Sequence, residues 1–470
     1  MPSERSGAVL TRALGLTRHP AALSVLVLVV TALSMTLGVA MHDTCLGYEG
    51  GPPIGSQTCV SDIPALYKLR DLADHVFPYG APGEFGLPDG TVEYPVLTGL
   101  IAWLVAWPAA VVPSAEGYYL VTSVVLLVVA FAVSSLLVRL AGRRALLFAA
   151  SPLLMLYGTQ NWDLFPVLFT VAGVLAWHRG RAGAAGVMFA LGACFKIFPL
   201  LFLIPLYADV RARHGRSAAL RAVAPGVVTG VLVNLPFMVR DVHGWWQPFA
   251  FQQARPVDES ALSIWSLTLP TTNLPLVNAL TTFALLVGVA VILFAASRRF
   301  EREGAYPVVQ VCGAFVLLWL VTAKASSPQF ALWALPFFVL LRVPLWTWLA
   351  TTAAVVWCHV AFYAWIGNAI TAAAAGEPGP QAHLAAPVLT RIAVFAIVMI
   401  VFMRSAHAID SAAVTYRRGH DDGDDDLAAP AGRDLDGSGD RGGADRLDHG
   451  RSADLARERG HAAAGARDGG

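Results

Sequence analysis

Residues 21–41, AALSVLVLVVTALSMTLGVAM, form an uncharged apolar stretch that is followed directly by a long polar segment. The stretch has the length of a membrane-spanning helix, about 20 residues, and is longer than the core of a secretory signal, about 7–15 residues. Arg5, Arg12 and Arg18 precede it. We therefore expect a retained first membrane helix and a cytoplasmic N-terminus at residues 1–20.

The whole chain has the composition of a membrane protein. Of its 470 residues, 56% are hydrophobic and 14% are charged, whereas soluble proteins average about 25% charged residues. The sequence therefore predicts an all-α polytopic membrane protein. Because the charges are segregated into loops and the tail, the net charge of +1 identifies no partner, and we expect no nucleic-acid partner.

Basic clusters separate the apolar stretches and predict the topology, because short loops rich in Lys and Arg stay in the cytoplasm. The clusters are Arg139/Arg143/Arg144, His178/Arg179/Arg181, Arg211/Arg213/Arg216, Arg298/Arg299/Arg302 and Arg404/Arg417/Arg418. Placing all of them inside predicts about twelve membrane helices with both chain ends in the cytoplasm. The predicted spans are residues 21–41, 118–138, 145–159, 164–178, 182–196, 197–208, 222–240, 274–297, 306–323, 329–342, 344–366 and 387–404.

Three segments lie outside this pattern. Residues 95–112 are apolar, but counting them as a span would place the next basic cluster outside, so we interpret them as an in-plane or re-entrant segment. The alternative is a thirteenth span that breaks the charge rule once. Residues 42–117 then form a structured first outer loop on the membrane domain, residues 21–404. Residues 405–470 carry an acidic run at 421–426 and are expected to be a disordered cytoplasmic tail.

The cysteines divide between the outer loop and the spans. Cys45 and Cys59 fall in the first outer loop, in a compartment where a disulfide is plausible. Cys194, Cys312 and Cys358 fall in predicted spans and are expected to pack as apolar residues.

The string Ser61-Asp62-Ile63-Pro64 opens a helical pattern within the outer loop. Ile63, Leu66, Leu69 and Leu72 recur at helical spacing, which predicts an amphipathic helix along the membrane. Asp62 lies at its start, where an aspartate often caps the helix by accepting backbone N–H bonds. The competing interpretation is a reactive carboxylate.

Charged side chains recur at the predicted outer ends of separate spans. The cations are Lys196, Arg255 and Lys324, and the carboxylates are Asp62, Glu93 and Asp163. A cation at an apolar boundary is unfavourable without a partner, although each could be an isolated side chain that reaches water. Several that converge predict a site for an anionic group such as a lipid phosphate.

The order of these motifs resembles that of a known group. The motifs are the early Asp62, Tyr94-Pro95, Asn161-Trp162-Asp163, Lys196 followed by Pro199, and Ser327-Pro328-Gln329-Phe330 with Trp333. Together they resemble GT-C-fold glycosyltransferases, and among these the polyprenyl-phosphate-mannose-dependent mannosyltransferases of glycosyltransferase family 87 in actinobacteria. The resemblance covers residues 21 to 404.

The resemblance implies a reaction on the extracytoplasmic face of the plasma membrane. A sugar, by default mannose, would pass from a polyprenyl-phosphate donor to a cell-envelope glycolipid or glycan in one inverting step. Asp62 would be the general base and Asp163 would position the acceptor or the base. Lys196, Arg255 and Lys324 would bind the donor phosphate. The implied cavity residues are Glu93, Tyr94, Asn161 and Gln329, and neither a cofactor nor a metal is expected.

Two other functions compete with this interpretation. A transporter or flippase for a lipid-linked anion would carry ionisable residues near the bilayer midplane, often within inverted repeats. The chain shows no such repeat, and its one mid-helix candidate, His359, is expected to be a hydrogen-bonded core residue. A membrane scaffold that recruits partners is the other alternative, but it has no use for cations at the outer ends of spans.

Overall fold

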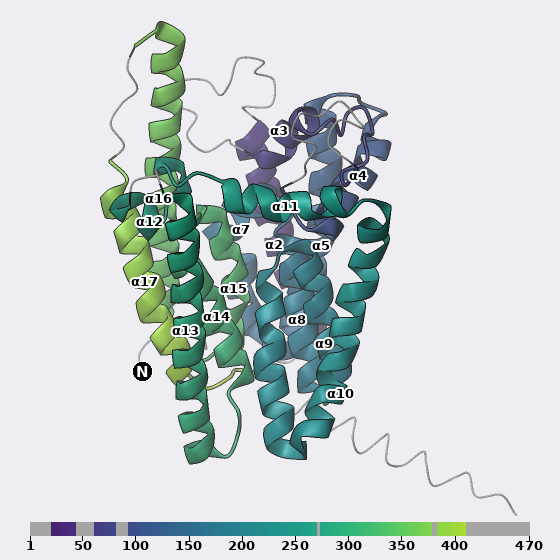
Figure 1. The fold of residues 1–470 in the computed structure, drawn as a ribbon, viewed down its shortest axis with the longest axis vertical. Helices are drawn as coiled ribbons and strands as arrows, with labels where there is room; N and C mark the ends of the chain where they lie inside the picture. Colours follow the sequence, from purple (N-terminus) through teal and green to yellow (C-terminus); the bar gives the residue numbers. More distant parts are fainter. Residues whose placement is uncertain (1–19, 44–60, 81–92, 270–272, 378–382, 410–470) are drawn as a thin grey trace, which may run out of the picture. The chain divides into compact units, whose positions relative to one another are not determined.

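The chain folds into a bundle of long helices in the described part of the structure, a computed structural model (Figure 1). The described residues are 20–43, 61–80, 93–269, 273–377 and 383–409. The long helices are α2 (Pro20–Asp43), α5 (Ala115–Ala141), α10 (Leu203–Arg240), α13 (Leu274–Glu303), α16 (Leu345–Ala375) and α17 (Ala385–Arg404). These six helices supply most of the length of the bundle.

Shorter helices fill the space between and above the long ones. They are α3 (Asp62–Leu69), α4 (Val96–Ala109), α6 (Leu146–Ala149), α7 (Pro152–Tyr157), α8 (Leu164–His178), α9 (Ala182–Phe195), α11 (Val242–Ala254), α12 (Ile264–Thr268), α14 (Val308–Thr322) and α15 (Leu335–Leu340). Four 3₁₀ turns join them: η1 (Gly142–Ala145), η2 (Phe198–Phe202), η3 (Glu259–Ala261) and η4 (Pro328–Trp333). In Figure 1, α3, α4 and α11 lie at one end of the bundle, and α11 crosses the long helices.

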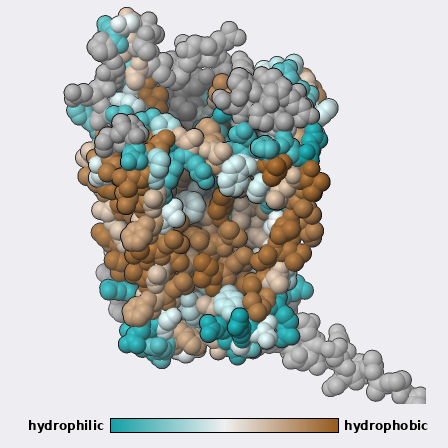
Figure 2. Space-filling model, in the orientation of Figure 1, coloured by the Kyte–Doolittle hydropathy of each residue, from teal (hydrophilic) through white to brown (hydrophobic). Residues whose placement is uncertain are grey.

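The surface of the bundle is apolar in a broad belt with polar groups at both ends (Figure 2). Exposed apolar side chains of the long helices include Leu232 on α10, 61% exposed, and Phe283 on α13, 66% exposed. Large apolar side chains are rarely exposed in contiguous patches on soluble proteins, so the belt is a lipid-facing surface. Together with the helical fold of the described residues, this belt supports the prediction of an α-helical membrane protein.

Six stretches in the described residues are long and apolar enough to cross a membrane: Pro20–His42, Ala115–Ala149, Phe198–Arg240, Leu274–Glu303, Leu345–Ala369 and Ala385–Arg404. Five further apolar helices are shorter: Val96–Ala109, Leu164–His178, Ala182–Phe195, Val308–Thr322 and Pro328–Leu340. The predicted number of twelve spans is thus not confirmed, and the in-plane or re-entrant placement of residues 95–112 stays a prediction.

Local chemistry explains why some predicted spans are broken. The span expected at 145–159 is interrupted where Ser151 accepts a hydrogen bond from Leu153 N and Pro152 starts α7, a combination that begins helices. The spans expected at 197–208 and 222–240 are not broken in this way: they lie within η2 and α10, and Gly215, with φ of 80°, interrupts α10 between them. The span expected at 329–342 divides into η4 and α15.

Several of the predicted cytoplasmic clusters meet at the end of the bundle opposite α3 and α11. The Arg299 guanidinium donates hydrogen bonds of 2.7 and 3.0 Å to the carbonyls of Met403 and Ser405. Arg144 donates to three carbonyls of residues 338–341 at 2.6–2.9 Å. Basic residues from distant parts of the sequence therefore gather at one end, as the charge rule requires of a common side.

A close contact between two helices of the bundle depends on two glycines. α9 and α10 pack along their lengths, and a Cβ added at Gly226 of α10 would lie 2.5 Å from the Gly186 carbonyl oxygen of α9. Small residues allow membrane helices to approach this closely and to gain van der Waals contact.

We expect Gly226→Ala to lower the stability of the protein in detergent by about 1–3 kcal/mol, because the added methyl overpacks the α9–α10 contact. Gly230→Ala is the matched control on the same helix, since nothing lies within 4 Å of its added Cβ. Thermal unfolding of both variants tests the expectation. Equal melting temperatures would mean that this contact does not limit the packing of α10.

Candidate functional site

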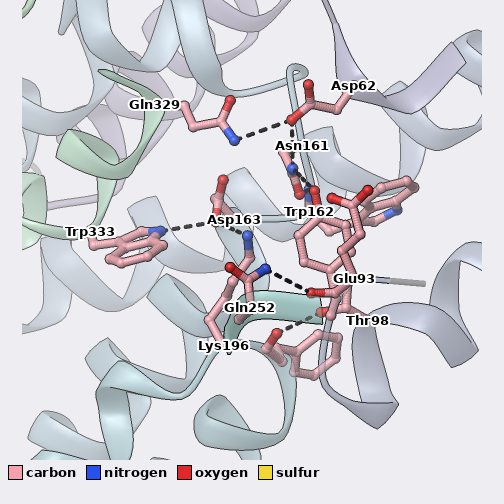
Figure 3. A network of polar contacts seen from close by, with 12 residues as sticks. Asp62, Glu93, Thr98, Asn161, Trp162, Asp163, Lys196, Gln252, Gln329 and Trp333 are labelled. Atoms are coloured by element: carbon pink, nitrogen blue, oxygen red, sulfur yellow. Dashed lines mark hydrogen bonds and ion pairs between the residues drawn. The ribbon is translucent and has the colours of Figure 1, made fainter. Parts of the chain in front are cut away.

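The site is built where the start of α3 meets the turn before α8 (Figure 3). The backbone N–H of Asp62 donates a 3.0 Å hydrogen bond to the Gln160 carbonyl. The Ser61 hydroxyl donates to the Thr159 and Gln160 carbonyls at 3.1 and 3.2 Å. Two segments nearly a hundred residues apart are thereby held in one register, which places Asp62 beside Asn161.

The Asp62 carboxylate is held by neutral amides. Its Oδ2 accepts hydrogen bonds from Asn161 Nδ2 at 2.8 Å and from Gln329 Nε2 at 3.2 Å. The capping bond at this helix start goes instead to the Ser61 hydroxyl, which accepts from Ile63 N at 3.3 Å. Among the described residues no group donates to Asp62 Oδ1, so this oxygen is available to a ligand.

Burial raises the pKa of the Asp62 carboxyl above its ordinary value, and hydrogen bonds from Asn161 and Gln329 oppose that rise. The nearby charge of Lys196 also lowers the pKa, while that of Asp163 raises it. Desolvation is the largest of these effects, and it makes the carboxylate more basic.

Asn161 connects Asp62 to Tyr94. Its Oδ1 accepts from Trp162 N at 2.6 Å, which assigns the amide so that Nδ2 faces Asp62 and the Tyr94 hydroxyl, 2.7 Å away. Burial raises the pKa of Tyr94 well above its ordinary value, and the charges of Asp62 and Glu93 add to this effect. Tyr94 is therefore a neutral phenol whose own proton is free to be donated to a ligand.

Lys196 and Asp163 form a buried ion pair beneath this group. Lys196 Nζ lies 3.2 Å from Asp163 Oδ1, which also accepts a 2.9 Å hydrogen bond from Trp333 Nε1. Both side chains are almost fully buried. Asp163 Oδ2 is buried as well and has no hydrogen-bond partner among the described residues, so the carboxylate keeps one unused acceptor.

Aromatic rings surround the ammonium of Lys196. Its Nζ lies 4.3 Å from the centre of the Tyr94 ring and 5.3 Å from that of Phe330. Phe330 stacks on Trp333 with the ring centres 4.4 Å apart. The cation is therefore stabilised by ring faces as well as by Asp163.

Glu93 is already paired in the structure. It forms an ion pair with Arg70, and its backbone carbonyl accepts a 3.4 Å hydrogen bond from Gln252 of α11. Glu93 therefore helps to position Tyr94 and α11, and its charge is balanced by Arg70.

Lys324 and Arg255 form a second cationic group at the end of α11. Lys324 Nζ donates to the Gln253 carbonyl and to Asn278 Oδ1, both at 2.9 Å. Burial lowers the pKa of Lys324, and the charge of nearby Arg255 lowers it further. No carboxylate among the described residues pairs with either cation, so this pair favours an external anion.

The structure thus places the predicted residues in two neighbouring groups. Asp62, Tyr94, Asn161, Asp163, Lys196 and Gln329 lie together, with Glu93 at the edge, while Arg255 and Lys324 accompany α11. Cys45 and Cys59 lie outside the described residues. Cys194, Cys312 and Cys358 are free and buried, as expected.

Sequence reasoning assigned no site role to several residues that the structure brings to this region. Trp333 bonds Asp163, and its three-residue spacing from Phe330 on η4 is the signal that could have identified it. Gln160 donates a 2.6 Å hydrogen bond to the Tyr363 hydroxyl. His359 was expected to be hydrogen-bonded, but both its ring nitrogens lack partners in the described region and its ring packs against Tyr157 and Tyr363.

No three His, Cys, Asp or Glu side chains in the described ranges are grouped as metal ligands would be. The polar groups of the described site are the basic carboxylate of Asp62, the neutral phenol of Tyr94, the side-chain amides of Asn161 and Gln329, the Lys196–Asp163 ion pair, and the cations Lys324 and Arg255.

We expect Lys196→Met to lower the free energy of unfolding by about 3–5 kcal/mol, because it leaves Asp163 buried without its partner. The double variant Lys196→Met/Asp163→Asn removes both charges and should recover part of this loss. A double-mutant cycle of unfolding in detergent measures the coupling. Additive losses in the two single variants would contradict a direct ion pair.

Part of the chain is similar to a known protein family. Residues 94–323 match the sequence profile of glycosyltransferase family 87. The match includes Tyr94, Asn161, Asp163, Lys196 and Arg255 and does not extend to Asp62 or Gln329. No curated protein matches the chain. The chain is therefore similar to glycosyltransferase family 87 over residues 94–323, and this similarity supports a membrane glycosyltransferase.

Proposed function

We propose that the enzyme transfers a sugar from a polyprenyl-phosphate donor to a hydroxyl of a cell-envelope glycolipid or glycan at the outer face of the plasma membrane. Mannose is the donor sugar that the family resemblance favours. The observation that carries the proposal is Asp62, a carboxylate made more basic by burial. Amides hold one of its oxygens, and no described residue donates a hydrogen bond to the other.

The proposed reaction is a single displacement with inversion. The acceptor hydroxyl gives its proton to Asp62 Oδ1 while its oxygen attacks the anomeric carbon. The bond from the anomeric carbon to the phosphate oxygen breaks, and its electron pair leaves with the phosphate. Tyr94, which stays protonated, and Asn161 keep the carboxylate in an uncharged hydrogen-bonding environment that does not compete with Asp62 for the proton.

Lys324 and Arg255 are the better candidates for binding the donor phosphate, in comparison with Lys196. The charge of Lys196 is already balanced by Asp163 at 3.2 Å, whereas Lys324 has only neutral acceptors and a second cation beside it. A phosphate placed there would relieve the repulsion between these two cations and stabilise the charge that develops on the leaving group. Asp163 then serves to neutralise and orient Lys196.

The position of α11 supports a lipid-linked donor. This helix crosses the bundle between α10 and α13 (Figure 1), and exposed apolar side chains of both helices face the lipid. Gln252 and Gln253 on α11 contact Glu93 and Lys324 through hydrogen bonds. A donor in the adjacent leaflet could therefore keep its chain in lipid while its phosphate reaches the cations beside α11.

Sidedness supports the outer face and favours an enzyme over a transporter or flippase. The site lies at the α3 and α11 end of the bundle, and the C-terminal ends of α13 and α17, the helices of Arg299 and Arg404, lie at the opposite end (Figure 1). By the charge rule the arginine-rich end is cytoplasmic. The functional side chains gather at one end of the bundle. A transporter would instead need a path that opens to both ends of the bundle.

We expect Asp62→Asn to lower the rate of sugar transfer about 10²–10⁴-fold, the usual contribution of a general base. The assay uses purified full-length protein in proteoliposomes with a labelled polyprenyl-phosphate sugar and extracted envelope lipids as acceptors. Asp74→Asn, an exposed carboxylate of the same segment, is the control and should keep full activity. Near-normal transfer by Asp62→Asn would exclude this residue as the base.

The same assay tests the pKa of Asp62. Since burial raises that pKa, the reactive carboxylate is lost as the pH falls through a value above that of an ordinary aspartate. The wild-type rate should therefore show an acidic limb, and Asp62→Asn should lack it. A rate that stays constant down to the ordinary aspartate range would contradict the proposed base.

We expect Lys324→Ala and Arg255→Ala each to raise the KM for the donor by about tenfold or more, because each removes a charged contact to the phosphate. Lys324→Arg should retain most of the affinity. Arg211→Ala, exposed at the opposite end, is the control for loss of positive charge. Equal KM values in all four variants would remove Lys324 and Arg255 from the donor site.

A further inference from the structure

A groove at the arginine-rich end of the bundle lies apart from the site described above. It is formed between the C-terminal halves of α13 and α17, which contact each other. Its volume is about 390 Å³, within the range of small-molecule sites. It includes none of the residues that form the transferase site.

The walls of the groove are apolar and open to the lipid. Val291 of α13, 61% exposed, and Ile400 of α17, 50% exposed, line it together with methionine side chains of α17. Such walls match a hydrocarbon chain in shape and polarity, and in a membrane-spanning bundle the groove adjoins the acyl region of the bilayer.

The rim at the end of the groove is cationic. It consists of Arg299, Arg302, Glu303 and Arg404. Glu303 pairs with Arg299 at 2.7 Å, and Arg299 also donates to the carbonyls of Met403 and Ser405. Neither Arg302 nor Arg404 has a hydrogen-bond or ion-pair partner within the described residues. Three positive charges and one negative charge leave the rim with two unbalanced positive charges.

We propose that this groove binds one anionic phospholipid, with an acyl chain between α13 and α17 and its phosphate against Arg302 and Arg404. Guanidinium groups bind phosphate oxygens through paired hydrogen bonds. Basic pockets between membrane helices favour anionic headgroups, because a zwitterionic headgroup would bring its own cation to the arginines. The proposal stands apart from the transferase reaction, whose donor lies at the other end.

The test counts bound lipid by native mass spectrometry of the full-length protein. Purified protein is mixed with equal amounts of phosphatidylglycerol and phosphatidylcholine in detergent. Wild-type protein should retain phosphatidylglycerol in preference to phosphatidylcholine. Arg302→Gln and Arg404→Gln should each reduce that preference about fivefold. Arg298→Gln, exposed on the same helix and paired with Glu301, is the control and should leave it unchanged.

A second pair of variants tests the acyl-chain part of the groove while keeping every charge. Ala295→Phe fills the groove and should lower retention of phosphatidylglycerol, whereas Val287→Phe, on the same helix outside the groove, should not. Soluble glycerol phosphate should not displace the lipid. The proposal is overturned if the arginine variants keep the wild-type preference, if Ala295→Phe binds as wild type, or if glycerol phosphate displaces the lipid.

Discussion

The hydrogen bonds between the start of α3 and the turn before α8 are the constraint on which the rest of the site depends. The Asp62 N–H and the Ser61 hydroxyl both donate to the Gln160 carbonyl. This backbone contact decides that Asp62 faces Asn161. It also leaves capping of α3 to Ser61, so the Asp62 carboxylate is free to take the amides of Asn161 and Gln329.

The cations near the site differ in whether the described residues balance their charge. Lys196 is neutralised by Asp163 and surrounded by Tyr94 and Phe330, which makes it a fixed part of the protein. Lys324 and Arg255 lie together without a described counter-charge, which leaves them suited to a ligand. The same contrast recurs at the other end of the bundle, where Arg299 bonds to the protein and Arg302 and Arg404 have no partner among the described residues.

The helical class and several element bounds could be predicted from the sequence because apolar length and helix signals are local. The prediction of a span at 164–178 coincides with α8, and that at 182–196 ends one residue beyond α9. The division of the 329–342 stretch into η4 and α15 was missed, although Pro336 at the start of α15 is a local signal for a new helix. From the sequence only Asp62 was considered as the cap of α3, whereas in the structure the adjacent Ser61 accepts the capping bond from Ile63 N.

The grouping of Asp62, Asp163 and Lys196 was predicted from their shared position at the outer ends of spans, and that of Asn161 and Gln329 from the family resemblance. The structure places these five residues together. Their pairing could not be predicted. The distances between side chains on different helices decide which carboxylate neutralises Lys196 and which cation stays unbalanced. Residue spacing in the sequence does not contain these distances. The hydrogen bond from Trp333 to Asp163 could not be predicted for the same reason, because it also depends on a distance between helices.

The most direct test of the account is an experimental structure of the full-length Asp62→Asn variant in lipid with a polyprenyl-phosphate sugar bound. The account predicts that the phosphate contacts Lys324 and Arg255 beside α11, with the anomeric carbon of the sugar facing position 62. A phosphate bound at the arginine-rich end, or a sugar whose anomeric carbon faces away from position 62, would contradict it.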